Sequence, residues 1–340
     1  MQTGCCPHLY YTLPQAMIIM NLEAIASEIR NFKGVTRKKS IADIAEILGT
    51  VRSEYTDCIA DIGDDAAIID IGGDDVLLFA ADGIWSAMLG DPWWAGYGAV
   101  LVNVNDISAM GGRPIGMVNV LATDNKETLA ELVRGIRDGV AKFGVPMVGG
   151  HLHPDTPYTS SSVAIVGIAK RDAVIRSDTA EAGDAIVLAY DLDGQVGKNS
   201  IYSWDSTTMK TAASVREKFM VMQTLGERGL VTAGKDISNP GTIGTLGMLL
   251  ETSRKGASVD MTAIPRPDGI DFVHWLKIYP ATGYVVTTRD ADECIRVFEA
   301  AGLDAAVVGV IDDGLCLDIY EGEARVTVFD FGKDVITGIG

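Results

Sequence analysis

CIADIGDDAAIID, residues 58–70, places several carboxylates inside an apolar stretch of strand-like composition. Asp61, Asp64 and Asp65 stand within five positions of one another around Gly63. Carboxylates this close repel one another, and burying a charge without a partner is energetically costly. The cluster is therefore either a solvated turn or a site that holds something positively charged.

The composition indicates a folded chain without nucleic-acid or membrane partners. At 340 residues, of which 47% are hydrophobic, the chain has room for about two domains of ~150 residues. Its apolar runs are shorter than the ~18 residues of a membrane-spanning helix, and residues 1–20 lack the basic and apolar regions of a secretion signal. A net charge of −18 repels nucleic acid and anionic membrane surfaces. We therefore expect a cytoplasmic protein.

Hydrophobic periodicity and turn residues predict an α+β chain in two halves. Residues 66–71 and 75–82 read as a hairpin, and Asp91 and Pro92 begin a helix that ends at Gly111–Gly112. Residues 207–229 read as one long helix.

The halves suggest a division into domains. We expect the N-terminal extension, residues 1–19, to be dispensable and Met20 to be the natural start, because the helical pattern begins only at Met20. The predicted parts are an N-terminal extension (1–19), an N-terminal domain (20–170) and a C-terminal α+β domain (171–340).

Polar side chains suited to a metal or a phosphate gather at the predicted ends of strands and helices. Asn103 and Asp106 are three residues apart and therefore share one helix face. Taken singly, each group has a simpler interpretation as a turn or a solvated face. The groups are Asp61, Asp64 and Asp65; Asp82; Asn103 and Asp106; His151, His153 and Asp155 after Gly149 and Gly150; and, more weakly, Asp236.

Asp106 makes magnesium and a nucleoside triphosphate the best joint interpretation of these groups. It lies in an apolar helix that reads as buried, where a carboxylate needs a cation or several donors. Mg²⁺ prefers carboxylate oxygens together with substrate phosphates. Five cysteines without a CxxC pair give no support to zinc or to a disulfide framework. GQVGKNS, residues 194–200, fails the P-loop spacing, so any ATP site is of another kind.

The order of the motifs resembles the AIR synthase-related superfamily. The resemblance runs over about residues 40–320 and is most specific at GDDAA and at Asn103–Pro114. The superfamily includes aminoimidazole ribonucleotide synthetase, thiamine-monophosphate kinase, selenophosphate synthetase and a hydrogenase maturation subunit, and the chain is most similar to an archaeal methanogenesis-marker branch. The motifs are GDDAAI (63–68), ADG (81–83), NVNDISAMGGRPIG (103–116), VGGH (148–151) and DISNPG (236–241).

The resemblance implies a fold, a chemistry and a set of residues. It implies N-terminal strands that form a barrel across a homodimer, a C-terminal α+β domain, and ATP in a cleft with Mg²⁺ on the aspartates. The metal ligands would be Asp64, Asp65, Asp82 and Asp106, with Asn103 and Asp236 also at the nucleotide and Asp106 serving catalysis.

Two loops supply further candidates. Lys39 and its neighbour Lys38 are candidate phosphate ligands. The simpler interpretation is that they belong to a run of charged side chains exposed to solvent. Gly149–Gly150 lets the backbone approach a ligand, and we predict that His151 faces the γ-phosphate end of ATP as a base or a second-substrate ligand. A loop histidine held by a backbone carbonyl is the alternative.

Two classes of function follow from these residues and motifs. The first is an ATP- and Mg²⁺-dependent enzyme that phosphorylates or activates a small molecule. The second is a nucleotide-binding maturation or scaffold protein that uses ATP as a switch without turnover of its own. At the position of His151, thiamine-monophosphate kinase has an aspartate and aminoimidazole ribonucleotide synthetase a glutamate. Selenophosphate synthetase has the histidine, but its reactive cysteine and lysine have no counterpart in KGVTRKKS (33–40). The resemblance therefore implies no particular second substrate.

Overall fold

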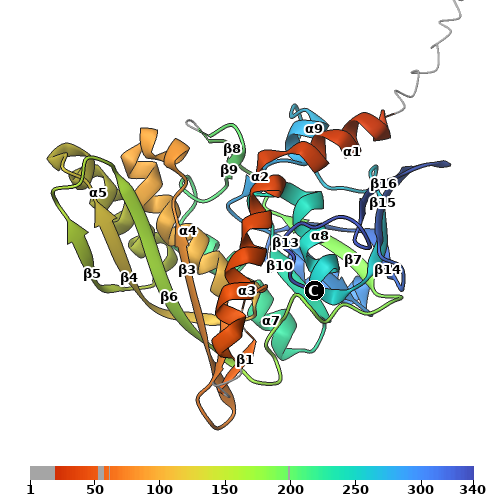
Figure 1. Cartoon of the computed structure of the whole chain (residues 1–340), viewed down its shortest axis with the longest axis horizontal. Coiled ribbons are helices and arrows are strands. Elements are labelled where there is room, and N and C mark those ends of the chain that lie inside the picture. The colour runs from red at the N-terminus through yellow and green to blue at the C-terminus, as the bar shows by residue number, and fades with distance from the viewer. Residues whose placement is uncertain (1–19, 53–56, 61, 198–199) are drawn as a thin grey trace, which may run out of the picture.

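The structure is a computed structural model that describes residues 20–52, 57–60, 62–197 and 200–340. Residues 1–19, Asp61 and residues 198–199 of the P-loop-like stretch lie outside the described residues, so the predictions made for them stay predictions. Among the described helices, none is long and apolar enough to cross a membrane. The chain forms two units, each a sheet with helices packed on it, that lie side by side (Figure 1).

The first unit contains a six-stranded sheet in the order β1-β2-β3-β6-β4-β5. The predicted hairpin is present as the antiparallel pair β2–β3. The sheet is open in the single chain, so the barrel expected across a homodimer does not close within one chain. The elements up to the end of this unit are α1 (Leu22–Asn31), α2 (Lys33–Thr36), η1 (Arg37–Lys39), α3 (Ser40–Arg52), β1 (Cys58–Ala60), β2 (Ala67–Asp70), β3 (Asp75–Gly83), η2 (Ser86–Gly90), α4 (Pro92–Ala109), β4 (Arg113–Ala122), α5 (Lys126–Phe143), β5 (Met147–His153) and β6 (Ser160–Lys170).

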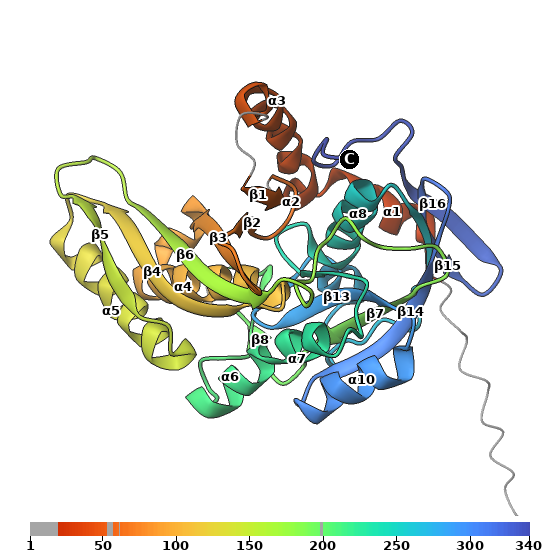
Figure 2. The same cartoon turned by 90° about the horizontal axis from the view of Figure 1, so that it is seen from below.

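Helices α4 and α5 cover one face of this sheet and pack unusually close to each other (Figures 1 and 2). As predicted, the Asp91 side chain caps α4 by accepting a hydrogen bond from the Trp94 N–H. Glycines form the contact between the helices. A Cβ atom at Gly96 would lie 2.1 Å from the Leu132 carbonyl oxygen, and one at Gly135 only 1.9 Å from the carbonyl oxygen of Trp93. This contact fixes α4 in place and leaves its C-terminal half to face the second unit.

The opposite face of the first sheet is not covered by any described helix and carries apolar side chains. Phe79, Val118, Val120 and Val148 are each more than 40% exposed. They come from the strands β3, β4 and β5, so the exposed apolar surface extends across the sheet. We call these four side chains the open apolar face.

The second unit is a seven-stranded sheet in the order β10-β13-β7-β14-β11-β15-β16 with helices on both faces. Alternate residues of β7 serve the two faces: Ile186 and Leu188 pack with α1 and α8, and Val187 and Ala189 with α7 and α10. The elements are β7 (Ala185–Tyr190), β8 (Gln195–Val196), β9 (Ser203–Asp205), α6 (Ala212–Phe219), α7 (Val221–Glu227), β10 (Ala233–Asp236), α8 (Gly241–Ser253), β11 (Gly256–Asp260), α9 (Phe272–Trp275), β12 (Tyr279–Pro280), β13 (Gly283–Thr288), α10 (Ala291–Ala300), β14 (Asp304–Asp312), β15 (Cys316–Glu321) and β16 (Ala324–Asp330).

Helix α1 departs from the expected division of the chain. The sequence pattern assigns residues 20–170 to the N-terminal domain, but Leu22, Ile25 and Ile29 are buried in the core of the second unit. The Met20 N–H also donates a hydrogen bond to a carboxylate oxygen of Glu321, 2.7 Å away. The amphipathic face of α1 is visible in the sequence, whereas the sheet that buries it is not, because either sheet offers apolar surface.

The helix predicted over residues 207–229 is divided in two. The break falls at Met220, between α6 and α7. There the Phe219 carbonyl accepts a hydrogen bond from the Ser108 hydroxyl of α4. A tertiary contact therefore interrupts a pattern that is locally helical.

The close helix contact generates a prediction about stability. We expect Gly135→Ala to lower the free energy of unfolding by about 3 kcal/mol, because α4 and α5 must separate to admit the new methyl group. Gly49→Ala is the matched control: a Cβ there meets nothing within 4 Å, and it lies in α3, where alanine favours the helix by up to about 1 kcal/mol. Urea denaturation of both variants measures the difference. Equal stabilities would show that the helices adjust without cost.

Candidate functional site

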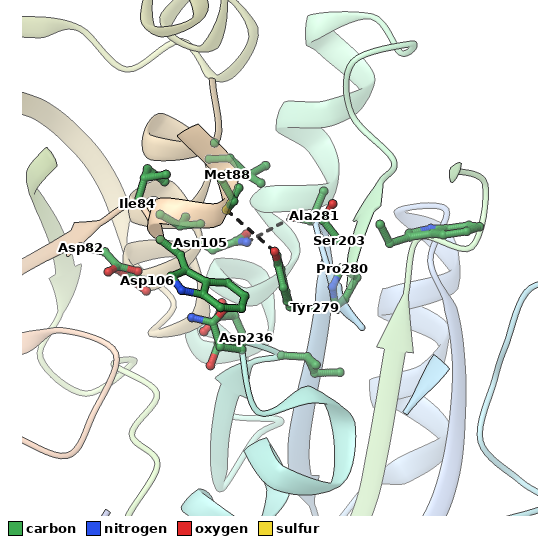
Figure 3. A pocket seen from close by; sticks show the side chains of 18 of the residues that line it. Asp82, Ile84, Met88, Asn105, Asp106, Ser203, Asp236, Tyr279, Pro280 and Ala281 are labelled. Carbon is green, nitrogen blue, oxygen red and sulfur yellow. Dashed lines mark hydrogen bonds between the residues drawn. The ribbon is translucent and has the colours of Figure 1, made fainter. Parts of the chain in front are cut away.

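A cleft between the two units brings three of the predicted acids together, while Asp64 and Asp65 lie outside its lining. It is lined by the end of β3, by η2 and α4 of the first unit, and by β9, β10 and β12 of the second. Figure 3 shows Asp82, Asp106 and Asp236 on one side of this cleft and Tyr279 and Pro280 on the other. These aspartates come from β3, α4 and β10, so the cleft exists only when the two units pack together.

Asp82 is held at the end of β3 by backbone contacts. Its carboxylate accepts a hydrogen bond from the Gly83 N–H at 2.6 Å, and its own N–H donates to Asn103 Oδ1 at 3.2 Å. The Asn103 amide in turn donates to the Ala99 carbonyl within α4. Asn103 is fully buried and therefore joins β3 to α4 instead of facing a ligand.

The turn that carries Asp64 and Asp65 has a positive partner within the protein itself. Lys235 Nζ lies 2.5 Å from Asp65 Oδ1 and 4.0 Å from Asp64 Oδ1. Asp64 also accepts hydrogen bonds from the backbone N–H groups of Asp65 and Ser177. Asp65 Oδ2 is buried and has no hydrogen-bond partner among the described residues. In this turn Asp65 therefore forms a buried ion pair with Lys235, and its Oδ2 atom remains without a hydrogen-bond partner among the described residues.

The acids raise one another's pKa values. Burial raises the pKa of Asp106 well above its ordinary range, and the charges of Asp236, Asp65 and Asp82 raise it further. Burial, followed by the charge of Asp65, raises the pKa of Asp236 to about 8. Burial raises the pKa of Asp64 to about 6. The pKa of Asp82 is also raised by desolvation in the cleft, although part of this residue remains exposed. These carboxylates therefore share one electrostatic environment that favours protons or metal ions.

Two lysines offset part of this charge. Burial lowers the pKa of Lys38, and Lys235 lowers it further, while the charges of Asp82 and Asp236 act in the opposite direction. Burial by itself would lower the pKa of Lys235, but Asp65 and Asp64 raise it above its ordinary value. Lys39 is exposed, so Lys38 is the lysine of the basic loop that faces the acids.

The structure does not bring His151 to the acids, contrary to the sequence prediction. His151 pairs with Val120 of β4, so its side chain lies on the open side of the sheet, whereas Asp82 pairs with Val163, whose side chain is buried on the helix side. Strand β5 is also three strands from β3, a distance of roughly 14 Å at ~4.8 Å per strand. Gly149 and Gly150 share this strand and do not line the cleft.

His151 and His153 do lie on the same side of their strand, as their spacing predicts. Their ring centroids are 4.6 Å apart in an edge-to-face arrangement. Both side chains are exposed. The pair belongs with the open apolar face and not with the acids.

Sequence reasoning missed Lys235 and the aromatic part of the cleft. Lys235 directly precedes Asp236 in the short apolar stretch AGKD, and a buried strand lysine is the signal that was available. Trp85, Trp94 and Tyr279 also line the cleft, and only their position in the fold reveals this.

The donor set fits magnesium better than a softer metal. The acids offer carboxylate oxygens, and Asp65 supplies a buried oxygen without a partner. Among the described residues, no three His, Cys, Asp or Glu side chains converge closely enough to hold an ion by themselves. This agrees with an ion that takes one or two carboxylates and completes its shell with phosphate oxygens and water.

Comparisons with known proteins agree with this geometry. Residues 63–169 match the AIR synthase related protein N-terminal domain, and residues 181–318 match the corresponding C-terminal domain. An uncharacterized protein of Methanocaldococcus jannaschii is 49% identical over 94% of this chain and 100% of its own length. A selenide, water dikinase of Carboxydothermus hydrogenoformans is 26% identical over 76% of this chain and 78% of its own.

Solved structures show the same fold. PurL of T. maritima, complexed with ATP, matches 80% of this chain with a TM-score of 0.67 at 18% identity. This match covers 47% of the PurL chain, so the present chain corresponds to about half of that protein. Both family domains occur here in order and enclose the acid cleft, and the chain belongs to the AIR synthase-related superfamily.

Proposed function

We propose that this protein is an ATP- and Mg²⁺-dependent enzyme that phosphorylates or activates a small molecule. The observation that carries the proposal is that Asp82, Asp106 and Asp236 line one cleft from separate elements of both units. Asp65, Lys38 and Lys235 are close enough to shift pKa values in this group. A purely structural site has no reason to keep carboxylates together at this electrostatic cost. Relatives of the chain include a dikinase and a synthase subunit solved with ATP.

In this proposal the acids hold Mg²⁺ and the cations hold phosphate oxygens. Bound Mg²⁺ supplies charge neutralisation for the β- and γ-phosphates. Asp82, Asp106 and Asp236 line the cleft and are the nearest ligands for the ions. Arg37 lines the same cleft and Lys38 faces the same acids, so both are placed to bind phosphate. Asp64 and Asp65 are engaged by Lys235, which makes them secondary ligands.

A scaffold that merely binds ATP is the other class considered, and no observation favours it. The cleft continues past the acids into a second, apolar part lined by Trp85, Met88 and Tyr279. An enzyme can use such a part to hold a second substrate beside the phosphates.

We expect ATP binding to require both Mg²⁺ and Asp106. Asparagine is isosteric with the protonated carboxyl that burial favours, so Asp106→Asn should leave the fold intact while removing a ligand that carries charge. Calorimetry should show Mg·ATP affinity reduced at least about tenfold, or ~1.4 kcal/mol, and no measurable binding in EDTA. Asp268→Asn, an exposed acid outside the cleft, should change affinity less than about twofold. Equal affinity of the Asp106 variant and the wild type would remove the metal assignment.

The raised pKa values predict how stability depends on pH. The ordinary pKa of an aspartate is 3.8, and in the folded protein the pKa values of Asp64 and Asp236 are about 6 and about 8. At pH values between 3.8 and these folded-state values, each carboxyl binds a proton in the folded state but not in the unfolded state. Stability contributed by these protons is present at low pH and is lost as pH rises through this window. In EDTA we expect the melting temperature to fall from pH 5 to pH 8.5, and Mg²⁺ to stabilise more at pH 8.5, where the acids are ionised.

Asp236→Asn is the control for this pH dependence. It keeps the neutral form at every pH, so its melting temperature in EDTA should fall less than that of the wild type across the same range. A variant with an undiminished fall would show that other groups cause the pH dependence.

We further propose a homodimer that buries the open apolar face. Phe79, Val118, Val120 and Val148 form an exposed apolar patch on an open sheet, which is typical of an interface. Light scattering at micromolar concentration should give twice the chain mass of 36.1 kDa. Val120→Glu should produce monomers, whereas Val133→Glu, equally exposed but on α5, should not. A wild-type monomer would contradict the dimer.

A further inference from the structure

A second pocket adjoins the acid cleft and is lined by cations. It encloses about 960 Å³, including space open to solvent, which is within the range of small-molecule sites. Lys33, Arg37 and Lys277 line this pocket, and Glu28 is the one acid among its described lining residues. Three cations and one carboxylate give the pocket a charge of +2, in a chain whose net charge is −18. We call this space the basic pocket.

Two of the three cations have no acidic partner. Lys33 Nζ and Arg37 Cζ each lie 5.6 Å from the centroid of the Trp85 ring. Neither side chain forms an ion pair with a carboxylate of the described residues. The two residues are four positions apart on consecutive helical turns, where like charges repel each other. An anion bound between them would offset this repulsion.

The walls that carry these cations are formed by close packing. Gly34, which follows Lys33, is buried, and a Cβ atom there would lie 2.0 Å from the carbonyl oxygen of Asn239. Helix α2 is therefore packed directly on the loop that precedes α8. On another wall, Lys277 forms an ion pair with Glu28 at 2.8 Å, and its side chain is only 17% exposed. The cations thus belong to a formed concave site.

The basic pocket and the acid cleft have a common boundary. Four residues line both spaces: Arg37, Trp85, Asn239 and Tyr279. Lys33 and Lys277 line the basic pocket but not the cleft. A ligand that extends from the acids across this boundary would therefore place its far end beside these two lysines.

We propose that the basic pocket binds the anionic end of the second substrate, a phosphate or carboxylate group, through Lys33 and Lys277, with Arg37 at the boundary. The proposal rests on the proposed function, because that function assigns the acids to Mg·ATP. Lys33 and Lys277 are then substrate-binding residues, and the reactive end of the substrate lies toward the acids.

Phenyl phosphate is a suitable probe, because its phosphate is anionic and its ring protons can be followed by NMR. Saturation-transfer NMR on the full chain in metal-free buffer should detect its binding. Without Mg²⁺ the acids repel a phosphate, so the basic pocket is the site that remains for it. Phenol, which has the same ring without the charge, should bind at least about tenfold more weakly. Equal binding of phenyl phosphate and phenol would overturn the assignment of an anionic group.

Lys33→Gln tests a cation that lines the basic pocket and not the cleft. Affinity for phenyl phosphate should fall at least about threefold, because a charge-assisted contact is lost, while Mg·ATP affinity should stay within about twofold. Lys126→Gln is the matched control: it removes the same charge from an exposed position on α5 and should change neither affinity. Equal phenyl phosphate affinities of the wild type and Lys33→Gln would overturn the proposed site.

Glu28→Gln provides a test in the opposite direction. It removes the one acid among the described lining residues, so affinity for phenyl phosphate should rise about threefold. A loss of stability would not produce tighter binding, which makes a rise specific to the charge of the pocket. An affinity that does not rise would contradict binding by charge in this pocket.

Competition separates this inference from the proposed function. A saturating concentration of the Mg²⁺ complex of a non-hydrolysable ATP analogue should not displace phenyl phosphate. Displacement would assign the basic pocket to the phosphates of the nucleotide, which overturns the inference while supporting ATP binding. If calorimetry shows no Mg·ATP binding while Lys33→Gln still weakens phenyl phosphate binding, the proposed function fails and the anion site is supported.

Discussion

The ion pair between Asp65 and Lys235 is the constraint on which the rest of the site depends. It joins the acidic turn of the first unit to strand β10 of the second, and both side chains are less than 10% exposed. Removing one member of a buried pair costs about 3–5 kcal/mol, because the other charge remains buried. The pair therefore ties the relative position of the units to the electrostatics of the cleft. Asp236, the next residue after Lys235, is placed by the same contact.

The remaining acids can lie close together because they need not all be ionised at once. In the metal-free protein, burial and mutual repulsion raise the pKa values of Asp106 and Asp236, so protons carry part of the charge. Mg²⁺ would replace these protons with a stronger neutralising charge. Asn103 holds the end of β3 against α4, and glycine contacts hold α4 against α5. Rigid packing behind the acids thus keeps them close to one another.

Much of the acid site and part of the fold could be predicted because the responsible signals are local. Asp91 and Pro92 mark the start of α4, and turn residues mark the β2–β3 hairpin. The order of the motifs along the chain predicted that the acids belong to one site, although they lie in separate segments. Local signals failed where a tertiary contact decides, as at Met220, where α4 interrupts a helical pattern.

His151 shows why the remainder could not be predicted. A shift of one residue along a strand reverses the face on which a side chain lies, so a motif alone does not say which side of the sheet it serves. The strand order, which places β5 at the far edge, depends on pairings between distant segments. Lys235 was missed for a similar reason: its role depends on Asp65, which is 170 positions away in the chain.

Mg²⁺ and ATP are expected to bind to the acids as one unit, since the carboxylates alone do not form a complete metal site. Mn²⁺ in place of Mg²⁺ permits a direct measurement, because the paramagnetic resonance signal of the free ion disappears on binding. Titration of the protein with Mn²⁺ should show weak binding alone and binding at least about tenfold tighter in the presence of a non-hydrolysable ATP analogue, after correction for Mn²⁺ bound to the analogue in solution. Mn²⁺ affinity that is the same with and without the nucleotide would contradict joint binding at the acids.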